Sequence, residues 1–535
     1  MSKSCDFHTK LIQGLLQPAA WPAAVTAISH IETHISTVLL TGDYAYKIKK
    51  PVDLGFLDFS SLARRKHFCE EEIRLNSRLA PQIYLDVVPV TGTADQPRIG
   101  GLGPAIEYAV KMRQFEPDAL LSNHPELLTI ERMDQLARIV AAFHSHIAVA
   151  DSDQPFGTIP AIFAPMEENF AQARKLVDQA DDQQRLDQLE QWSRAQLESL
   201  QDLLTQRRTG GFIRECHGDM HLGNIALVDD EILIFDGLEF APALRWIDTI
   251  SEIAFLIMDL QEKGKADLAQ RFLNSYLAIT GDYEGLRLLR FYQLYRAMVR
   301  VKVDLIRLQQ PGLSSADQAA VQADYRAYLT LAEGYTRKTA PALIITHGLS
   351  GSGKSTVVMS LLGTLSAIQL RSDIERKRLA GLAAGSDSGS GLHQGIYSPQ
   401  MTAETYRRLK ELAAIAIKAG FVAVVDATFL KHDDRQPFYA LAQQLDVPFL
   451  ILDFQLPEAV LRQRIEQRLA AGGDPSEAHQ AVLDAQLVTQ EPLTASEEAL
   501  SIRVTPEKSD CAAEVLCRLR SSALSQVPWM SGGAT

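Results

Sequence analysis

The segment "GLSGSGKS", residues 348–355, has the spacing G-x-x-x-x-G-K-[ST] and follows the apolar run "ALIIT", residues 342–346. Such glycines let backbone N–H groups turn toward phosphates, the lysine reaches the terminal phosphates, and the hydroxyl binds magnesium. We therefore predict an ATP site made of loop residues Gly348, Gly351, Ser352, Gly353, Lys354, Ser355 and Thr356. In this site Lys354 is also a catalytic candidate, and Ser355 is a magnesium ligand.

Two carboxylates follow strand-like runs beyond this motif. Asp373 ends "AIQLRSD", and Asp426 follows "FVAVV". Ligands gather at the carboxyl ends of strands in open α/β sheets, so both side chains could face the phosphates. We expect Asp426 to orient magnesium or its water and Asp373 to activate an acceptor hydroxyl. Helix N-capping is the alternative role for each.

A later helical stretch, "LRQRIEQRLAAGGDPSEAHQ", carries Arg464 and Arg468 four residues apart. That spacing puts both on one helix face, with Arg462 nearby, so two guanidiniums could reach a transferring phosphate. The Gly-Gly-Asp-Pro break that follows would suit a hinged lid. Ordinary solvated charge on a helix is the alternative.

A second group of chemical residues lies far upstream, in "CHGDMHLGNIALVDDEILIFDGLEF". His217, Asp219 and Asn224 fit H-x-D-x-x-x-x-N, and Asp236 follows an apolar strand. A kinase needs one carboxylate to accept the proton of the attacking hydroxyl, and an amide with a second carboxylate to hold magnesium. We therefore expect Asp219 to be the catalytic base and Asn224 and Asp236 to be metal ligands. His217 and His221 are expected to be structural.

The run "YAYKIKK" places Lys47 in the A-x-K arrangement of the strand lysine that reaches nucleotide phosphates. Lys49 points to the same strand face and is the rival candidate. Glu72, in the helical stretch "HFCEEEIRLNSRLA", could pair with that lysine, whereas Glu70 and Glu71 are solvent-facing alternatives.

Residues 1 to about 335 resemble the aminoglycoside phosphotransferase family, a branch of the eukaryotic-like protein-kinase fold, through "HGDMHLGNI" and "IFD". The resemblance implies a two-lobed kinase with ATP in its cleft and a small-molecule hydroxyl acceptor. One departure is that "HISTVLLTGD" stands where a G-x-G-x-x-G phosphate loop is expected. The alternative is that this domain senses a ligand and regulates the rest of the chain.

Residues 341 to about 520 resemble the P-loop kinases that include polynucleotide 5′-hydroxyl kinases, zeta toxins and gluconate kinase. The matching pieces are "GLSGSGKST", "RSDIERK", "VVDAT" and "LRQRIEQR". By that resemblance Asp373 would be the general base, and Arg464 and Arg468 would belong to the lid. The whole chain looks like a bacterial fusion of the two kinds of domain.

The order of the elements supports the same division. Strand-like segments near the amino terminus give way to long helical patterns, which predicts an α+β, two-lobed kinase-like domain over residues 1–337. From residue 338, strands alternate with helices, which predicts an α/β P-loop domain with a parallel sheet over residues 338–523. Residues 524–535 are expected to be a disordered tail.

Composition narrows the range of partners. The 535 residues carry a net charge of −13, and residues 341–535 contribute 18 basic and 21 acidic side chains. A nucleic-acid surface needs clustered positive charge, so nucleic acid is an unlikely partner. Five scattered cysteines, no signal peptide and no apolar run that could span a bilayer favour a cytoplasmic protein that does not enter membranes.

Together these features predict a bifunctional, ATP- and Mg²⁺-dependent phosphotransferase with two separate ATP sites, acting on small-molecule hydroxyl groups. The alternative joins a ligand-sensing first domain to a P-loop ATPase or a polynucleotide 5′-hydroxyl kinase. The sequence leaves the acceptor, the coupling of the two sites and the oligomeric state open.

Overall fold

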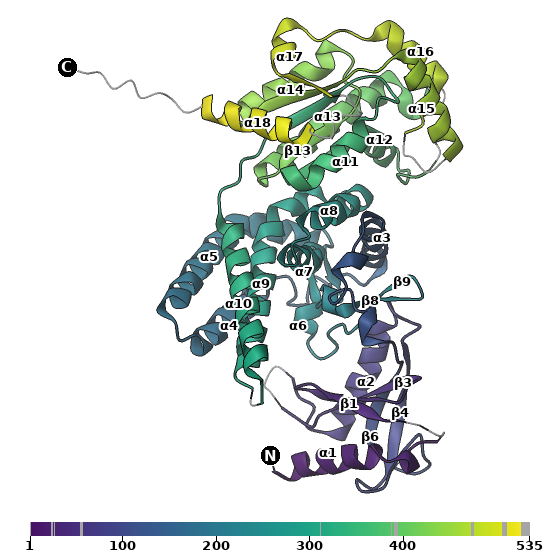
Figure 1. Ribbon diagram of the computed structural model, residues 1–535, viewed down its shortest axis with the longest axis vertical. Coiled ribbons are helices and arrows are strands. Elements are labelled where there is room, and N and C mark those ends of the chain that lie inside the picture. Colours follow the sequence, from purple (N-terminus) through teal and green to yellow (C-terminus); the bar gives the residue numbers. More distant parts are fainter. Residues whose placement is uncertain are drawn as a thin grey trace, which may run out of the picture. The chain divides into compact units, whose positions relative to one another are not determined.

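The computed structural model describes most of the chain (Figure 1). The described residues are 2–22, 25, 27–53, 57–310, 312–386, 388–389, 394–471, 476–504 and 511–525. The chain divides into two compact units: the first comprises residues 1–129, 142–259 and 295–329, and the second comprises residues 130–141, 260–294 and 330–535.

The first unit contains a six-stranded antiparallel sheet of order β1-β2-β3-β6-β4-β5. Its strands are β1 (Ser29–Glu32), β2 (Ser36–Leu40), β3 (Tyr44–Lys49), β4 (Tyr84–Gly92), β5 (Pro97–Ile99) and β6 (Ala105–Arg113). Side chains alternate along β3, so Tyr46 and Ile48 join a core with Leu11 and Leu15 of α1 (Ser2–Leu15). Lys47 and Lys49 therefore point to the opposite face, toward α2 (Leu62–Asn76).

Helices and two short strand pairs make up the rest of the first unit. The strand pairs are β7 (Ile213–Glu215) with β10 (Trp246–Asp248), and β8 (Ile225–Val228) with β9 (Glu231–Ile234). The helices α4 (Ile159–Leu176), α5 (Ala180–Thr209) and α6 (Pro242–Arg245) lie wholly within this unit. Four others contribute residues to both units: α3 (Ile130–His146), α7 (Thr249–Glu262), α9 (Leu286–Leu308) and α10 (Ser315–Thr336).

The second unit contains a five-stranded sheet of order β12-β13-β11-β14-β15 in which every pairing is parallel. Its strands are β11 (Leu343–His347), β12 (Ala367–Arg371), β13 (Val422–Asp426), β14 (Phe449–Phe454) and β15 (Ser501–Val504). All residues of β11, β13 and β14 are buried, as expected for Val- and Ile-rich strands covered on both faces. The predicted α+β and α/β fold classes are both confirmed.

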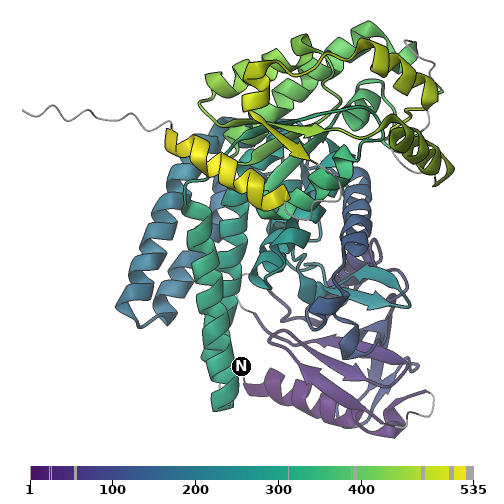
Figure 2. The same ribbon diagram turned by 45° about the horizontal axis from the view of Figure 1, so that its top comes forward.

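Helices surround this sheet, as Figure 2 shows for the second unit. One side packs α11 (Lys354–Leu365) and α18 (Cys511–Ser525) against the strands, through Val358, Leu361 and Val515. The remaining helices are α12 (Ser372–Leu379), α13 (Pro399–Lys418), α14 (His432–Gln444), α15 (Glu458–Ala471), α16 (Gln480–Thr489) and α17 (Ala495–Ala499).

The compact units differ from the division that the sequence suggests at residue 338. The second unit also takes in residues 130–141 and 260–294, which include α8 (Ala266–Thr280). Of the predicted tail, residues 524 and 525 end α18, and residues 526–535 lie outside the described residues. Within the described ranges, no helix has the length and apolar character needed to cross a membrane.

Candidate active sites

The glycine-rich segment forms the turn between β11 and α11, as the motif requires. Gly348 and Gly351 have φ angles of 146° and 82°, which side chains rarely tolerate. A Cβ atom would lie 2.6 Å from the carbonyl oxygen of Phe454 at Gly348, and 2.9 Å from that of Leu461 at Gly351. Only glycine fits these two positions without moving β14 or α15.

Lys354 is folded over the loop that contains it. Its Nζ donates to the carbonyl oxygens of Gly348 at 2.9 Å and Leu349 at 2.7 Å, and to Ser352 Oγ at 3.3 Å. Burial lowers the pKa of Lys354 to about 8, although Asp426 and Asp373 act in the opposite direction. An ammonium group held over an inward-facing loop is suited to an anionic ligand.

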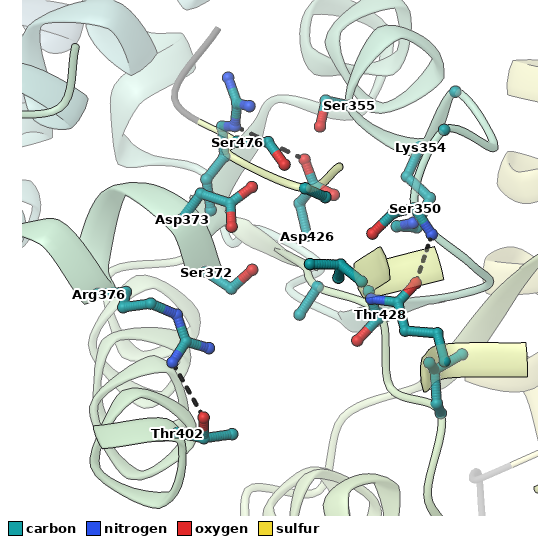
Figure 3. Close-up of a pocket in the computed structure, with 18 of the residues that line it drawn as sticks. Ser350, Lys354, Ser355, Ser372, Asp373, Arg376, Thr402, Asp426, Thr428 and Ser476 are labelled. Carbon is teal, nitrogen blue, oxygen red and sulfur yellow. Dashed lines mark hydrogen bonds and ion pairs between the residues drawn. The ribbon is translucent and has the colours of Figure 1, made fainter. Parts of the chain in front are cut away.

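A pocket of about 730 Å³ opens beside this loop (Figure 3). It brings together most of the residues predicted for this half: Gly351, Gly353, Lys354, Ser355, Thr356, Asp373, Asp426, Arg464 and Arg468. Gly348 and Ser352 are not part of the lining, and Ser352 is buried.

Asp426 is the last residue of β13 and is only 5% exposed. Gln369 of β12 donates from Nε2 to Asp426 Oδ2 at 2.8 Å, and Arg371 Nε lies 4.0 Å from the same oxygen. The sequence did not single out Gln369, because only the parallel pairing of β12 with β13 places it beside the carboxylate.

Asp373 is the second residue of α12, and Arg376 follows one turn later. Arg376 Nη1 donates to Thr402 Oγ1 at 3.0 Å and to the carbonyl oxygen of Ile396 at 3.0 Å (Figure 3). Its Nε is buried without a hydrogen-bond partner. Asp373 and this guanidinium line the same pocket, so a carboxylate and a cation with spare donor capacity face one volume.

The arginines of α15 separate into two groups. Arg464 and Arg468 line the pocket, and Arg468 Nη2 donates to the carbonyl oxygen of Ala478 at 2.7 Å. Arg462 instead pairs with Glu458 at 2.7 Å and Asp484 at 2.6 Å, outside the pocket lining. The predicted hinge falls on residues 472–475, which lie outside the described residues.

In the first unit, Lys47 lies between two carboxylates. Its Nζ is 2.6 Å from Asp236 Oδ1 and 2.9 Å from Glu72 Oε1. Burial disfavours the charged lysine, but Asp236 and Glu72 hold the pKa of Lys47 well above its usual value. The structure therefore joins the predicted strand lysine, its helix glutamate and the strand-end aspartate.

Lys49, the rival lysine, makes different contacts. It is fully buried and pairs with Glu72 Oε2 at 2.7 Å and with Glu239. Burial pushes the pKa of Glu239 upward, and Lys49 opposes this. Glu239, three residues after Asp236, was not predicted. The signal for it is Lys49, because a second lysine on the same strand face needs a carboxylate partner when it is buried.

The loop between β7 and β8 holds Asp219 and Asn224. Asn224 Nδ2 donates to the carbonyl oxygen and to Oδ2 of Asp219, both at 2.9 Å. His221 Nε2 lies 3.5 Å from the same carboxylate. Burial would raise the pKa of Asp219, but His221 and the hydrogen bond from its ring hold that pKa well below its usual value. Asp219 is thus ionised at neutral pH.

Two acidic residues of α7 accept backbone hydrogen bonds from this loop. Glu252 Oε2 accepts the backbone N–H of His217, and its Oε1 accepts that of Gly218, both at 2.7 Å. Asp259 Oδ2 accepts the N–H of Leu222 at 2.8 Å. Neither residue was predicted from the sequence. Their signal is two acidic positions seven residues apart, hence on one face, in a helix whose middle part is apolar.

Among the described residues, one group of three could in principle hold a metal ion: His144, Cys216 and Glu252. Both oxygens of Glu252 already accept backbone N–H groups. Burial also raises the pKa of the Cys216 thiol well above its usual value, so the thiolate is disfavoured. We therefore read this trio as support for the loop.

The segment "HISTVLLTGD", residues 34–43, covers the end of the connection between β1 and β2, strand β2 and the turn that leads to β3. Thr33 Oγ1 accepts the backbone N–H of Ser36 at 3.0 Å, which tightens the turn. Lys50 Nζ donates to the carbonyl oxygen of Thr33 at 2.7 Å. Side-chain hydrogen bonds thus hold the turn that precedes β2.

Two family models match separate parts of the chain. Residues 56–289 match the model of the phosphotransferase enzyme family, and residues 343–493 match that of an AAA domain. The protein Rv2004c of Mycobacterium tuberculosis, described as uncharacterized, is 30% identical over 458 residues, which cover 85% of this chain and 89% of that protein.

Solved kinase structures each align with part of the chain. A choline/ethanolamine kinase family protein from Mesorhizobium loti covers 61% of this chain and 99% of its own, with 12% identity and a TM-score of 0.36. The APS kinase of Mycobacterium tuberculosis covers 34% of this chain and 99% of its own, with 22% identity and a TM-score of 0.25. The match to Rv2004c spans most of both chains, so the protein belongs to the family of that mycobacterial protein. By its two family matches it is a kinase-type enzyme, with a phosphotransferase-family region followed by a P-loop kinase region.

Proposed function

We propose that the protein is a bifunctional, Mg²⁺-dependent phosphotransferase with two separate ATP sites, each acting on a hydroxyl group of a small molecule. The observation that carries the proposal is the P-loop pocket, which gathers Lys354, two carboxylates and two arginines from four different elements. Residues so far apart in sequence converge on one volume at the carboxyl ends of the strands, where phosphate ligands bind in this fold.

The residues of this pocket fit Mg·ATP. Lys354 directs its ammonium at carbonyl oxygens of its own loop, a weaker set of partners than phosphate oxygens would be. Nε atoms of Arg376 and Arg468 are buried without hydrogen-bond partners, so both guanidiniums have unused donors. Unused buried donors beside an inward-facing glycine loop suit a polyanion.

In the P-loop pocket, we assign Lys354 to the terminal phosphates and Ser355 and Asp426 to magnesium. The backbone amides of Gly351 to Thr356 would surround the phosphates at the amino end of α11. When bound, Mg·ATP supplies the phosphoryl group and the charge neutralisation that its transfer needs.

Asp373 is our proposed general base in this pocket. Its carboxylate would accept the proton of the acceptor hydroxyl as that oxygen forms its bond to phosphorus, and the bond to the leaving oxygen breaks. Arg464 and Arg468 would stabilise the charge on the transferring group from the side of α15. The leaving oxygen belongs to ADP, so the products would be ADP and the phosphorylated acceptor.

In the first unit, we assign the corresponding roles to the residues of the β7–β8 loop and to the cluster around Lys47. Asp219, ionised and held by Asn224, would be the base. Asn224 and Asp236 would hold magnesium, and Lys47, positioned by Glu72, would meet the nucleotide phosphates. For that role Lys47 would exchange Asp236 for a phosphate oxygen, which leaves Asp236 free for the metal.

A small acceptor is favoured over nucleic acid for the P-loop pocket. Its cationic side chains are Lys354, Arg371, Arg376, Lys431, Arg464 and Arg468. Lys354, Arg464 and Arg468 are assigned to phosphates already, and Arg371 lies beside Asp426. Few cations remain to follow a polynucleotide backbone, which requires several phosphate contacts.

One observation favours a different role for the first unit. The turn at Thr33 lacks the glycines that usually cover the phosphates, so nucleotide binding there depends on Lys47 and magnesium alone. The second candidate is therefore that the first unit senses a ligand and regulates the P-loop region. That region would then be an ATPase or a polynucleotide 5′-hydroxyl kinase.

The test is a transfer screen with the full-length protein, because the second compact unit includes residues from before position 338. Labelled ATP is offered with sugars, nucleosides, hydroxyl metabolites and 5′-OH oligonucleotides. We expect labelled small molecules, with each product lost in either Asp219→Asn or Asp373→Asn. If every product is still formed by Asp219→Asn and none by Asp373→Asn, the first unit transfers no phosphate, which would support its role as a ligand sensor. Salt-sensitive labelling of oligonucleotides would support the polynucleotide kinase.

A further inference from the structure

Helix α8 packs against the elements that carry the P-loop pocket. Its residues, Ala266–Thr280, fall inside the region that matches the phosphotransferase enzyme family. They nevertheless belong to the same compact unit as the parallel sheet. The contacts that place them there reach β12, α11 and α12.

The first set of contacts completes the edge of the sheet. β12 is an edge strand, and an edge strand leaves one row of backbone groups without a strand partner. Asn274 fills this gap: its Nδ2 donates to the carbonyl oxygen of Ala367 at 2.9 Å, and its Oδ1 accepts the N–H of Gln369 at 2.8 Å. Gln270 Nε2 donates to the same Ala367 carbonyl at 2.7 Å. The two buried amides thus act as a substitute strand.

Gln369, the strand residue that Asn274 contacts, also contacts a residue of the pocket. Gln369, whose N–H is held by Asn274, donates from its own Nε2 to Asp426 Oδ2 at 2.8 Å. A continuous hydrogen-bonded chain therefore runs from α8, through β12, to the carboxylate that we assign to magnesium. Since Asp426 has two oxygens, the one that Gln369 holds fixes where the other points.

The second set of contacts fixes α8 against two helices of the site. Gly363 in α11 has the backbone of Asp267 so close that a Cβ atom would lie 2.8 Å from its Cα. Arg378 of α12 donates to the carbonyl oxygens of Ala278 at 2.6 Å and Ile279 at 3.2 Å, at the carboxyl end of α8. α8 thus contacts both α11, which begins with Lys354, and α12, which carries Asp373.

We propose that Asn274 and Gln270 of α8 are positioning residues of the P-loop reaction, acting through Gln369 on Asp426. The inference rests on the proposed function, because it takes Asp426 as a magnesium-site residue. A segment within the phosphotransferase-family match is then part of the second active site, and the P-loop region does not carry a complete site by itself.

The test uses the full-length chain with Asp219→Asn, so that only the P-loop site turns over. Asn274→Leu, Gln369→Met and the double variant are compared with Ser275→Ala. Ser275 is the neighbour of Asn274 on α8, but its Oγ donates to Asp134 at 2.6 Å instead of to β12. Two readings are taken: the Mg²⁺ concentration for half-maximal turnover, and the affinity for ADP by calorimetry with Mg²⁺ and with EDTA.

We expect Asn274→Leu and Gln369→Met to raise the Mg²⁺ requirement about 10-fold, since loss of an outer partner of a metal site has effects of about this size. ADP affinity in EDTA should stay unchanged, and so should both readings for Ser275→Ala. The double variant should be no worse than the more affected single variant, because both act through one chain of contacts. Gln270→Met, which leaves the two bonds of Asn274 in place, should shift the Mg²⁺ requirement less and in the same direction.

Several outcomes would overturn the proposal. An unchanged Mg²⁺ requirement in Gln369→Met and Gln270→Met would do so even if Asn274→Leu fails to fold. Additive effects in the double variant would mean that α8 acts through packing alone. Failure of the proposed function would give a different result: the Asp219→Asn protein itself would show no Mg²⁺-dependent turnover. The Mg²⁺ dependence of ADP affinity, compared between Asn274→Leu and Ser275→Ala, would then still show whether α8 positions the magnesium site.

Discussion

The two candidate sites each hold a lysine in a different electrostatic setting. Lys47 lies between carboxylates, which hold its pKa well above its usual value even though burial disfavours the charge. Lys354 is surrounded mostly by carbonyl oxygens, and burial lowers its pKa to about 8. At neutral pH both are charged, but only Lys354 is close to losing its proton.

A pH dependence of nucleotide binding follows from Lys354. Below pH 8 the free protein carries the charged ammonium that a phosphate needs, and above pH 8 this charge is lost unless binding takes up a proton. In an Asp236→Ala background, the affinity of the P-loop site for ATP should fall up to about 10-fold per pH unit above pH 8. Calorimetry in buffers of different ionisation enthalpy measures the proton uptake. Lys354→Arg should remove the dependence, and a flat wild-type profile would contradict the assignment.

A second residue-scale prediction concerns Glu252. Burial acts to raise its pKa, but His144, His217 and the backbone hydrogen bonds lower that pKa to about 2. The folded-state pKa is depressed, so the ionised carboxylate stabilises the protein above the unfolded value of about 4.3, and this is lost as pH falls toward 2. Glu252→Gln should reduce the free energy of unfolding of the first unit at pH 7 by about 3 kcal/mol.

Urea unfolding at pH 7 and pH 4 would measure this loss, with Glu262→Gln at the end of the same helix as control. The wild type should lose stability between the two pH values more steeply than Glu252→Gln. Equal slopes, or equal losses in both variants, would show that Glu252 does not hold the loop through its charge.

At the scale of elements, α15 presents two faces with different neighbours. Arg464 and Arg468 face the pocket, whereas Arg462 is tied to Glu458 and Asp484 at the surface. The i and i+4 spacing predicted the first two from sequence. Of the partners of Arg462, Glu458 lies four residues earlier on α15, whereas Asp484 lies on α16, whose position relative to α15 no local pattern reveals.

The contrast between these arginines gives a matched pair of variants. Arg468→Ala should lower kcat of the P-loop reaction about 100-fold with little change in ATP affinity, because it removes a donor aimed at the transferring group. Arg462→Ala, on the same helix, should stay within about 2-fold of wild type, as for an exposed ion pair. Steady-state kinetics of the full-length Asp219→Asn protein would decide, and equal effects of both changes would contradict the role of Arg468.

Sequence alone predicted the fold classes because strand and helix patterns are local. It also predicted the motif residues, because a turn or strand end carries them at fixed spacing. It did not predict Gln369, Glu239, Glu252 or Asp259, whose partners come from other elements. The pairing of β12 with β13 and the packing of α7 against the β7–β8 loop determine those contacts. A short-range pattern can mark such a residue, as the spacing of Glu252 and Asp259 does, but it does not identify the partner.

At the scale of the whole molecule, the regions that match two families and the compact units divide the chain differently. The phosphotransferase-family match ends at residue 289, yet α8 belongs to the unit that contains the P-loop sheet. A cut near residue 338 would expose the Ala367 and Gln369 backbone groups that Asn274 and Gln270 hold. Work on either site should therefore keep the chain whole.

The central claim, two separate ATP sites, is tested most directly by the number of Mg·ATP-analogue molecules that one full-length chain binds. Equilibrium dialysis with a non-hydrolysable analogue should give two per chain for the wild type and one for each of Lys354→Ala and Asp236→Ala, and the double variant should bind none. One molecule per chain in the wild type, lost in Lys354→Ala and unaffected by Asp236→Ala, would contradict the account and leave the first unit without a nucleotide site.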